Sequence, residues 1–313
     1  MGKVYIYHHN DHDGIVAAGI LRQHLFEVEK RKLEDLKFIM IDYDMELNFD
    51  HIDFEESRDK VYFLDYSFSN KRNQEEFKKL LDRRRVDRDV KWIDHHITSI
   101  GMFSEYLIPG VRNTALCGAA WTYLYCEGLA DDMLTLEDRI STVFHEGKTI
   151  PTFLKYIDDY DCWKHIYGDT TRYFHYGFNV DTPMAVSIRK LLKHDKKADF
   201  RIIDIIKTGE IIMEHNKFED KNYHVDMYGF EFTLPEEHGG IKCFCLNRKG
   251  NSIMFGDKVN EYDAVIPFFY VNGKWKYSIF SNKPHVNCEA IAKTYGGGGH
   301  PKAAGWVGDF IFG

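Results

Sequence analysis

The 313-residue sequence lacks several features that mark specialised classes of protein. No apolar run approaches the roughly 20 residues that a membrane-spanning helix needs. The first residues lead directly into histidines and aspartates, unlike an apolar signal segment. The six cysteines are scattered, and none forms the C-x-x-C pair of a zinc ribbon or a thioredoxin-like site. These absences predict a cytoplasmic protein with reduced thiols and no membrane partner.

The chain also has fewer basic than acidic residues. The chain has 41 lysines and arginines against 49 aspartates and glutamates, which gives a net charge of -8. Proteins that wrap long duplex nucleic acid rely on many lysine and arginine contacts to phosphate, so the charge argues against this mode of binding and leaves only local basic patches open. Carboxylates and the 16 histidines instead supply many ligands for divalent cations. The positions of these ligands then decide the function.

The first part of the chain alternates between short β-prone runs and helical segments. Helices are expected at Ile15–Leu25, opened by Gly14, and at Asn73–Arg84. Such alternation predicts a mostly parallel sheet covered by helices. The expected strands are Val4–Tyr7, Phe38–Tyr43, Val61–Leu64 and Val90–Ile93.

The pattern becomes mainly helical from Ala119 to about Phe218 and then changes again after Tyr223. Length and this change predict two domains: residues 1–220, and a smaller α/β domain at residues 221–313, with a cleft between them. A hairpin turn is expected at Asn272–Gly273. The clearest helices are Leu134–Val143, Ile188–Lys193, Ile202–His215 and Cys288–Tyr295, and the later strands are Ile241–Leu246, Ala264–Tyr270 and Trp275–Phe280.

Acids and histidines follow three of the expected parallel strands. The carboxyl ends of such strands meet at the sheet edge where ligands bind, so these side chains are expected to converge. Each cluster alone also fits a solvated turn or a helix cap. The clusters are His8-His9-Asn10-Asp11-His12-Asp13-Gly14, Asp65, and Asp94-His95-His96.

A fourth cluster places Asp158, Asp159 and Asp161 in one short stretch. Like charges this close are costly unless a cation or a solvated helix end relieves them. Together the four clusters indicate a site for two divalent metals, which such sites hold roughly 3.5–4 Å apart. Mixed aspartate and histidine ligands without thiolate favour Mn²⁺ over Mg²⁺ and over structural Zn²⁺.

A run of four glycines, followed by His300 and Lys302, predicts a phosphate-binding turn near the end of the chain. Glycines expose backbone N–H groups and let a phosphate approach, and the two basic side chains add charged donors. We therefore expect Gly297, Gly298, Gly299 and His300 to bind substrate. Arg112 is a further candidate for contact with a substrate phosphate.

The order of these motifs, from Asp11-x-Asp13-Gly14 to Gly-Gly-Gly-Gly-His300-Pro-Lys-Ala-Ala-Gly, resembles that of DHH phosphoesterases with a DHH-associated C-terminal domain. That superfamily includes RecJ-like exonucleases, nanoRNases, cyclic-dinucleotide phosphodiesterases and manganese pyrophosphatases. The resemblance covers nearly the whole chain. It implies a catalytic N-terminal domain and a substrate-binding C-terminal domain.

The resemblance also implies roles for single residues. Asp65 would bridge two Mn²⁺ ions, and Asp94 would orient His95. His96 would contact the scissile phosphate or act as a general acid. The remaining metal ligands would be His9 and Asp11 on one ion, and Asp13, His95 and Asp159 on the other.

Two of these ligand assignments stay open, and one motif departs from the family. His8 and His9 both stand closer to the first aspartate than the family pattern has it, and Asp161 is the alternative to Asp159. Phe280 lies in the segment where many members carry an arginine. Phosphate recognition by the second domain is therefore expected to differ.

These expectations describe a metal-dependent phosphoesterase. Its substrates would be phosphodiester or terminal phosphate bonds of short single-stranded oligonucleotides or small nucleotides. A cyclic-dinucleotide phosphodiesterase is the alternative within the family, and a non-catalytic nucleotide-binding module is the alternative outside it. The oligomeric state is left open, with a homodimer among the options.

Overall fold

Two compact units make up the chain, Met1–Ile212 and Met213–Gly313. The computed structural model describes residues 2–130, 150–180, 184–193, 195–222, 225–271 and 273–312. The helix expected at Leu134–Val143 and the Asn272 position of the expected turn lie outside these residues. The assignment of a catalytic and a substrate-binding domain on either side of residue 220, with a cleft between them, stays a prediction.

The first unit is built on a parallel sheet with the strand order β2-β1-β3-β4. The expected strands are confirmed with small shifts at their ends. β1 begins where expected and runs two residues longer, to His9, and β2 ends at Ile41 and not at Tyr43. The strands are β1 (Val4–His9), β2 (Leu36–Ile41), β3 (Lys60–Leu64) and β4 (Val90–Ile93).

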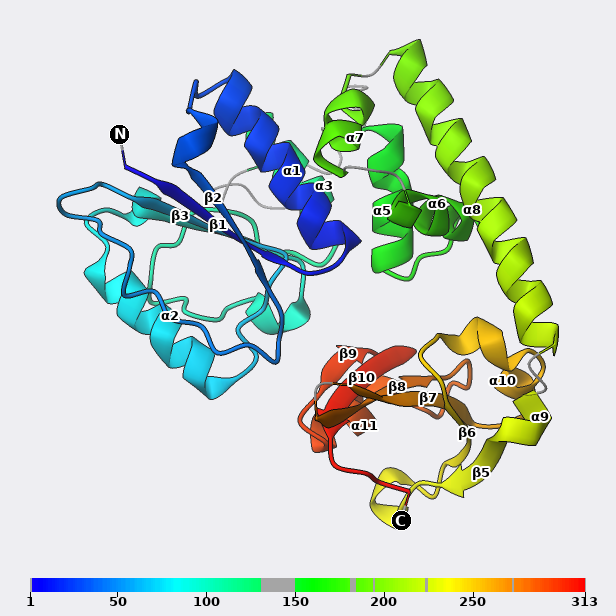
Figure 1. The fold of residues 1–313 in the computed structure, drawn as a ribbon. Coiled ribbons are helices and arrows are strands. Elements are labelled where there is room, and N and C mark those ends of the chain that lie inside the picture. Colours follow the sequence, from blue (N-terminus) through cyan, green and yellow to red (C-terminus); the bar gives the residue numbers. More distant parts are fainter. Residues whose placement is uncertain are drawn as a thin grey trace. The chain divides into compact units, whose positions relative to one another are not determined.

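Helices cover both faces of this sheet (Figure 1): α1 (His12–Glu27) and α3 (Gly118–Cys126) on one, α2 (Lys71–Arg83) on the other. Alternate residues of each strand enter different cores. Ile6 packs in the core that contains α1 and α3, whereas Tyr7 packs in the core that contains α2. Burial on both faces explains why the strands read as continuous apolar runs. It leaves the carboxyl ends of the strands as the place for polar side chains.

Two residues, Asp11 and Gly14, fix the turn from β1 into α1. Asp11 caps α1, and its Oδ1 accepts a hydrogen bond of 2.9 Å from the Gly14 amide. The helix therefore begins at His12, three residues before the expected start. A side chain at Gly14 would place its Cβ 2.4 Å from the carbonyl oxygen of His9. Glycine is needed there because the helix turns back over the end of the strand.

The helical part of the first unit contains a close helix crossing. A Cβ at Gly177 would lie 1.8 Å from the carbonyl oxygen of Ile205, and one at Gly209 would lie 1.7 Å from that of Tyr173. The two glycines thus allow backbone-to-backbone packing of α6 and α8. The helices of this part are α5 (Thr152–Asp161), α6 (Asp169–Val180), α7 (Met184–Leu191) and α8 (Lys196–Asn222).

The second unit is a mixed sheet with the strand order β5-β6-β7-β8-β10-β9, which confirms a second α/β unit. Its glycine run does not form a free loop, because Gly298–His300 is an edge strand, β9. The elements are α9 (Val225–Tyr228), β5 (Gly229–Thr233), β6 (Lys242–Asn247), α10 (Lys258–Glu261), β7 (Ala264–Val271), β8 (Lys274–Phe280), α11 (Cys288–Thr294), β9 and β10 (Ala303–Gly308).

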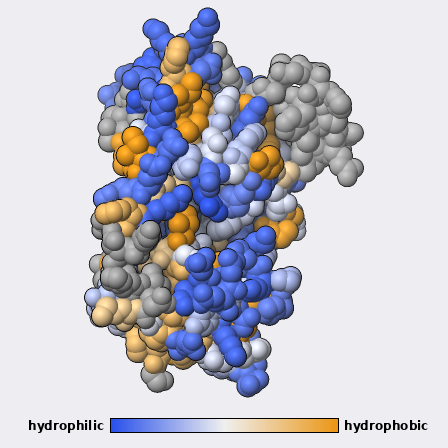
Figure 2. Space-filling view, turned by 90° about the vertical axis from the view of Figure 1, so that its right-hand side faces the viewer, coloured by the Kyte–Doolittle hydropathy of each residue, from blue (hydrophilic) through white to orange (hydrophobic). Residues whose placement is uncertain are grey.

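The surface carries mixed polarity. On the face shown in Figure 2, apolar side chains gather in small groups among hydrophilic ones. Within the described ranges, no helix has both the length and the apolar character to span a membrane.

Candidate metal centre

Asp65 lies at the middle of the acidic cluster and directly follows β3. Its side chain is 1% exposed, and its backbone has a φ of 53°, in the left-handed region. Neither carboxylate oxygen has a hydrogen-bond partner among the described residues. A strained backbone and a buried carboxylate that accepts no hydrogen bond both cost stability. A cation bound to both oxygens is the group that fits this arrangement.

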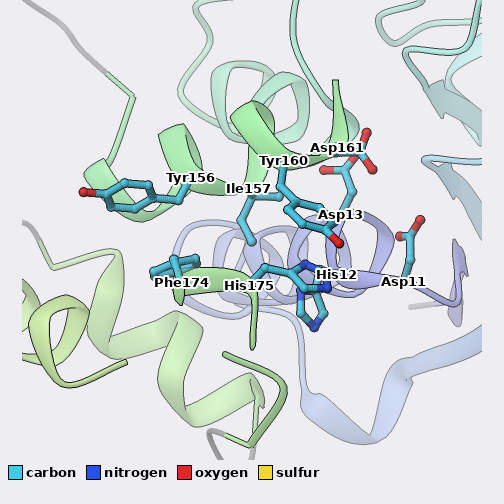
Figure 3. Close-up of a pocket in the computed structure, with 9 residues that line it drawn as sticks. All are labelled: Asp11, His12, Asp13, Tyr156, Ile157, Tyr160, Asp161, Phe174 and His175. Atoms are coloured by element: carbon cyan, nitrogen blue, oxygen red, sulfur yellow. The ribbon is translucent and has the colours of Figure 1, made fainter. Parts of the chain in front are cut away.

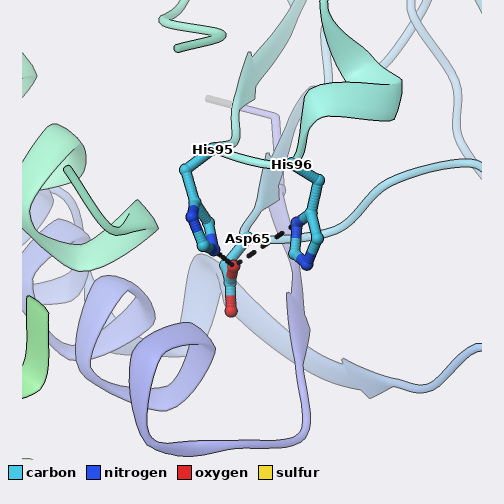
Figure 4. Close-up of side chains that lie close together, drawn as sticks. All are labelled: Asp65, His95 and His96. Carbon is cyan, nitrogen blue, oxygen red and sulfur yellow. Dashed lines mark ion pairs between the residues drawn. The ribbon is translucent and has the colours of Figure 1, made fainter. Parts of the chain in front are cut away.

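The two oxygens of Asp65 face different groups of potential ligands. Oδ1 lies 3.2 Å from Nε2 of His95 and 3.9 Å from Nδ1 of His96 (Figure 4). Oδ2 lies 3.8 Å from Nδ1 of His9, which in turn lies 2.8 Å from Oδ2 of Asp11. Asp65, His95 and His96 therefore form one possible metal site, and His9, Asp11 and Asp65 form another.

Asp13 joins this cluster to the start of α3. Its Oδ2 and Oδ1 accept hydrogen bonds of 2.6 and 2.7 Å from the amides of Gly118 and Ala119, where the helix dipole favours an anion. Oδ2 also lies 3.7 Å from Nε2 of His95. A Cβ at Gly118 would lie 2.8 Å from the Cβ of Asp65, so glycine permits this approach.

The geometry favours Asp161 over Asp159 as the ligand from the fourth cluster. Asp159 accepts a 2.7 Å hydrogen bond from the Ile166 amide and another from the hydroxyl of Thr171, so its carboxylate holds the segment after α5. Oδ2 of Asp161 lies 3.1 Å from Nε2 of His95 and has no hydrogen-bond partner within the described part of the chain. The expectation had placed Asp159 first and Asp161 second.

The geometry also separates His8 from His9. Consecutive strand residues point to opposite faces, and only His9 faces the carboxylates. The ring of His8 instead contacts the carbonyl oxygen of His9, with 3.0 Å between them. Asp42, which is not among the expected ligands, lies 3.8 Å from Nε2 of His9. It follows β2 at the same sheet edge.

Asp94 contacts the ring of His96, whereas it contacts His95 only at the backbone amide. Its Oδ1 lies 2.8 Å from Nδ1 of His96 and accepts a 2.8 Å hydrogen bond from the backbone amide of His95. The hydroxyl of Ser99 donates to its other oxygen. The expectation that Asp94 orients the ring of His95 is thus replaced by an interaction with the ring of His96. On the far side of that ring, Nε2 lies 3.3 Å from the hydroxyl of Tyr43.

Burial and crowding of charge perturb the titration of this cluster. Burial, together with the charge of Asp11, raises the pKa of Asp65 to about 7. Burial and the charge of Asp65 raise the pKa of Asp13 well above its usual value. For His95 burial lowers the pKa, but Asp161 and Asp65 outweigh it, so the net pKa is raised. These shifts show that the cluster favours added positive charge.

The other predicted binding residues lie in different surroundings. The guanidinium of Arg112 donates to the carbonyl oxygens of Trp92 and Ile108, at 3.1 and 3.0 Å. It thereby ties the chain around residue 110 to β4. Gly297, Gly298, Gly299 and His300 belong to the second unit. A role for these residues in substrate binding stays a prediction.

A small aromatic pocket borders the carboxylates of Asp11, Asp13 and Asp161 (Figure 3). Its volume is about 130 Å³. The ring of His175 stacks on Tyr160 with centroids 3.7 Å apart and lies 4.3 Å from that of His12. Burial lowers the pKa of His12, and burial with the neighbouring His12 lowers that of His175 to about 3, so both imidazoles are neutral at pH 7. The other lining residues are Tyr156, Ile157 and Phe174.

This pocket was not predicted from the sequence. His12 belongs to a recognised motif, but its partner His175 comes from α6, more than 160 residues later. The tyrosines and Phe174 read as ordinary core residues. Helix packing alone brings them to the acidic cluster.

Comparisons with known proteins point to one fold. No protein-family model matches the chain, and no curated protein matches it. Among solved structures, the chain resembles the DHH domain of a protein described as a member of a family of ribosomal proteins. The identity is 13%, the TM-score is 0.55, and the match covers 99% of this chain and 83% of that one.

Two further structures are similar at lower TM-scores. RecJ from Thermus thermophilus in complex with Mn²⁺ has 15% identity and a TM-score of 0.48, with 98% of this chain and 49% of that chain covered. A pGpG-specific phosphodiesterase from Vibrio cholerae has 11% identity and a TM-score of 0.45, with 98% and 94% covered.

Proposed function

Because the chain has the fold of DHH-family phosphoesterases, we propose that it hydrolyses phosphate esters with the help of two divalent metal ions. The proposed substrates are short oligonucleotides or small nucleotides, and the proposed ions are Mn²⁺. The observation that carries the proposal is the carboxylate of Asp65. It is buried, neither of its oxygens accepts a hydrogen bond within the described residues, and the two oxygens face two different groups of ligands.

The ligands divide between the two oxygens of Asp65. His9 and Asp11 lie on the Oδ2 side, and Asp13, His95 and Asp161 lie on the Oδ1 side. When bound, a pair of divalent ions supplies Lewis acidity toward the phosphate oxygens and the attacking water. The protein's part is to hold these ligands in place. Asp13 does so through its hydrogen bonds to the start of α3.

His96 is the proposed general acid. Its Nδ1 lies 2.8 Å from Oδ1 of Asp94, which fixes the orientation of the ring. Its Nε2, near the hydroxyl of Tyr43, would donate a proton to the leaving oxygen. The arrangement follows the common pattern in which a buried carboxylate sets the orientation of a catalytic imidazole.

The aromatic pocket supports a substrate that carries a ring. Its lining has no lysine or arginine, and its two imidazoles are neutral, so it offers no cation to a phosphate. A neutral planar group beside the scissile phosphate matches it better. A nucleotide has such a group, and inorganic polyphosphate has none.

A substrate panel with a metal control tests the proposal. The chelator-treated protein is assayed with dinucleotides, longer oligonucleotides, cyclic dinucleotides, 3′,5′-bisphosphate nucleotides and pyrophosphate, with and without Mn²⁺. We expect turnover of the dinucleotides or bisphosphates only when Mn²⁺ is added. Full turnover in excess chelator would refute the metal-dependent mechanism. Turnover of pyrophosphate alone would refute the substrate class.

A further inference from the structure

A cysteine lies against the metal cluster without belonging to the proposed manganese ligands. Cys162 caps the end of α5, directly after Asp161. Its sulfur lies 3.9 Å from Nδ1 of His95, the nitrogen on the far side of the ring from Asp65. It is half-buried and reduced. The sulfur therefore faces the ring nitrogen of His95 that does not face Asp65.

Three different ligand types meet at this point. One nitrogen of His95, the sulfur of Cys162 and one oxygen of Asp161 all lie within 4.8 Å of one another. Ligand atoms around a tetrahedral zinc ion lie about 3.4–3.7 Å apart, as follows from Zn–N of about 2.1 Å and Zn–S of about 2.3 Å. Asp161 lies 3.1 Å from Nε2 of His95, whereas Cys162 lies 3.9 Å from Nδ1 of the same ring. A single ion would bind only one of these nitrogens, with the other two ligand atoms within 4.8 Å of it.

One member of this group has room for a further ligand, because its only close polar contact within the described residues is the ion pair with His95. Oδ2 of Asp161 is buried and has no hydrogen bond in the described chain. Cys162 is different, because its S–H donates to Oδ1 of Asp158 at 3.5 Å. Asp158 is itself fixed by Lys164 at 2.6 Å and by the Cys117 amide at 2.9 Å. The sulfur is therefore held beside His95 by a network that does not depend on a metal.

We propose that His95, Asp161 and Cys162 form a site for a thiophilic divalent ion, such as Zn²⁺ or Cd²⁺. Thiolate sulfur selects these ions over Mn²⁺ and Mg²⁺, and Zn²⁺ binds nitrogen and sulfur ligands more tightly than Mn²⁺ does. The thiol proton is released to solvent as the sulfur–metal bond forms. A Cys, His and Asp set leaves the fourth tetrahedral position to water.

The site shares two ligands with the proposed manganese centre. An ion bound through Cys162 takes His95 and Asp161 away from the activating pair. Such an ion is therefore an inhibitor that competes with Mn²⁺. This second statement rests on the proposed phosphoesterase activity, whereas the binding site itself does not.

Binding is tested without any assay of activity. Chelator-treated full-length protein is titrated with Cd²⁺, and the ultraviolet charge-transfer band of the cadmium–thiolate bond is followed. We expect the band in the wild type and in the control Cys126→Ser, which alters another half-buried thiol, but not in Cys162→Ser. Asp161→Asn should weaken Cd²⁺ binding at least tenfold. A band that persists in Cys162→Ser would overturn the proposal.

Inhibition is tested separately at saturating Mn²⁺. We expect Zn²⁺ to inhibit the wild type, and Cys162→Ser to need at least tenfold more Zn²⁺ for the same inhibition. Equal inhibition of both proteins would show that Cys162 is not a ligand of the inhibitory ion. If the protein has no phosphoesterase activity but shows the Cys162-dependent cadmium band, the proposed function fails and the site stands.

Discussion

Two sheet edges in this molecule carry the residues expected to meet substrate, and they are built in opposite ways. The edge of the parallel sheet in the first unit concentrates buried, charged side chains around Asp65. The edge of the mixed sheet in the second unit, β9, consists of glycines and His300. The first edge presents buried charged side chains. The second exposes backbone by having almost no side chains.

The difference decides how each edge should respond to mutation. At the charged edge the interactions are electrostatic, so a change of one charge affects activity and stability in opposite directions. At β9, the edge made of glycines, the effect of a new side chain is steric. It depends on the space around each Cα.

Replacing Asp65 with Asn should abolish turnover. The substitution removes the charge proposed to hold both ions, so kcat should fall by at least about a thousandfold at saturating Mn²⁺ and substrate. The matched control is Asp204→Asn, which alters an exposed carboxylate on α8. Steady-state kinetics on the best substrate of the panel measure the change. An Asp65→Asn protein within tenfold of wild type would disprove the bridging role.

The same substitution should stabilise the metal-free protein at neutral pH. The pKa of Asp65 is about 7 in the folded state, against about 3.9 in an unfolded chain. Between these values the folded state holds a proton that the unfolded state has lost. The free energy of unfolding therefore falls as pH rises from about 4 to 7, by on the order of 3 kcal/mol.

Asparagine at residue 65 removes this dependence, and it also tolerates the left-handed backbone well. Urea unfolding of chelator-treated protein at pH 5 and pH 7.5 measures the effect for both proteins. We expect the wild type to lose more stability between these pH values than Asp65→Asn. Identical losses would mean that Asp65 is ionised throughout this range.

Replacing Gly118 with Ala should disturb the charged edge by steric means. The new Cβ would lie 2.8 Å from the Cβ of Asp65 and 3.0 Å from Oδ2 of Asp13. Alanine normally favours a helix over glycine by about 1 kcal/mol, but this overlap should reverse the sign and cost about 1–3 kcal/mol. Thermal unfolding and kcat should both decrease. An unchanged melting temperature would show that α3 can move away without cost.

Replacing Gly298 with Ala should have the smallest effect on the folded protein. No atom lies within 4 Å of the added Cβ, so stability should change by less than about 0.5 kcal/mol. If this strand approaches a substrate phosphate, KM should rise while kcat stays the same. Gly299→Ala is the comparison, because its φ of 142° and a 2.6 Å approach to the carbonyl oxygen of Ala303 should destabilise the fold. An unchanged KM for Gly298→Ala would remove this strand from the binding site.

The sequence was sufficient to predict the parallel sheet and the convergence of Asp11, Asp65 and His95. This was possible because the signal lies in neighbouring residues: each of these polar residues follows a buried apolar strand, either directly or within the turn after it. The same rule applies to Asp42. It was missed because the expected strand was extended to Tyr43, which hid the fact that β2 ends one residue before Asp42.

The choice between Asp159 and Asp161 could not be made from the sequence, because both residues lie on α5, two positions apart. Two residues turn a helix by about 200°, so only one of the pair can face His95. Which one does so depends on the rotation of α5 against the sheet, a property of tertiary packing. The edge strand β9 also depends on tertiary packing. Its glycines form a strand only because β10 lies beside them and pairs with them.

The hydrogen bonds from Asp13 to the start of α3 have a consequence for folding order. They join residues that are 105 and 106 positions apart, so this part of the site closes only after β1, β3, β4 and α3 have assembled. Contacts of such long sequence separation generally form late, because the entropy of loop closure must be overcome first. A divalent ion that needs the completed site therefore has little to bind in the folding transition state. It should slow unfolding far more than it accelerates refolding.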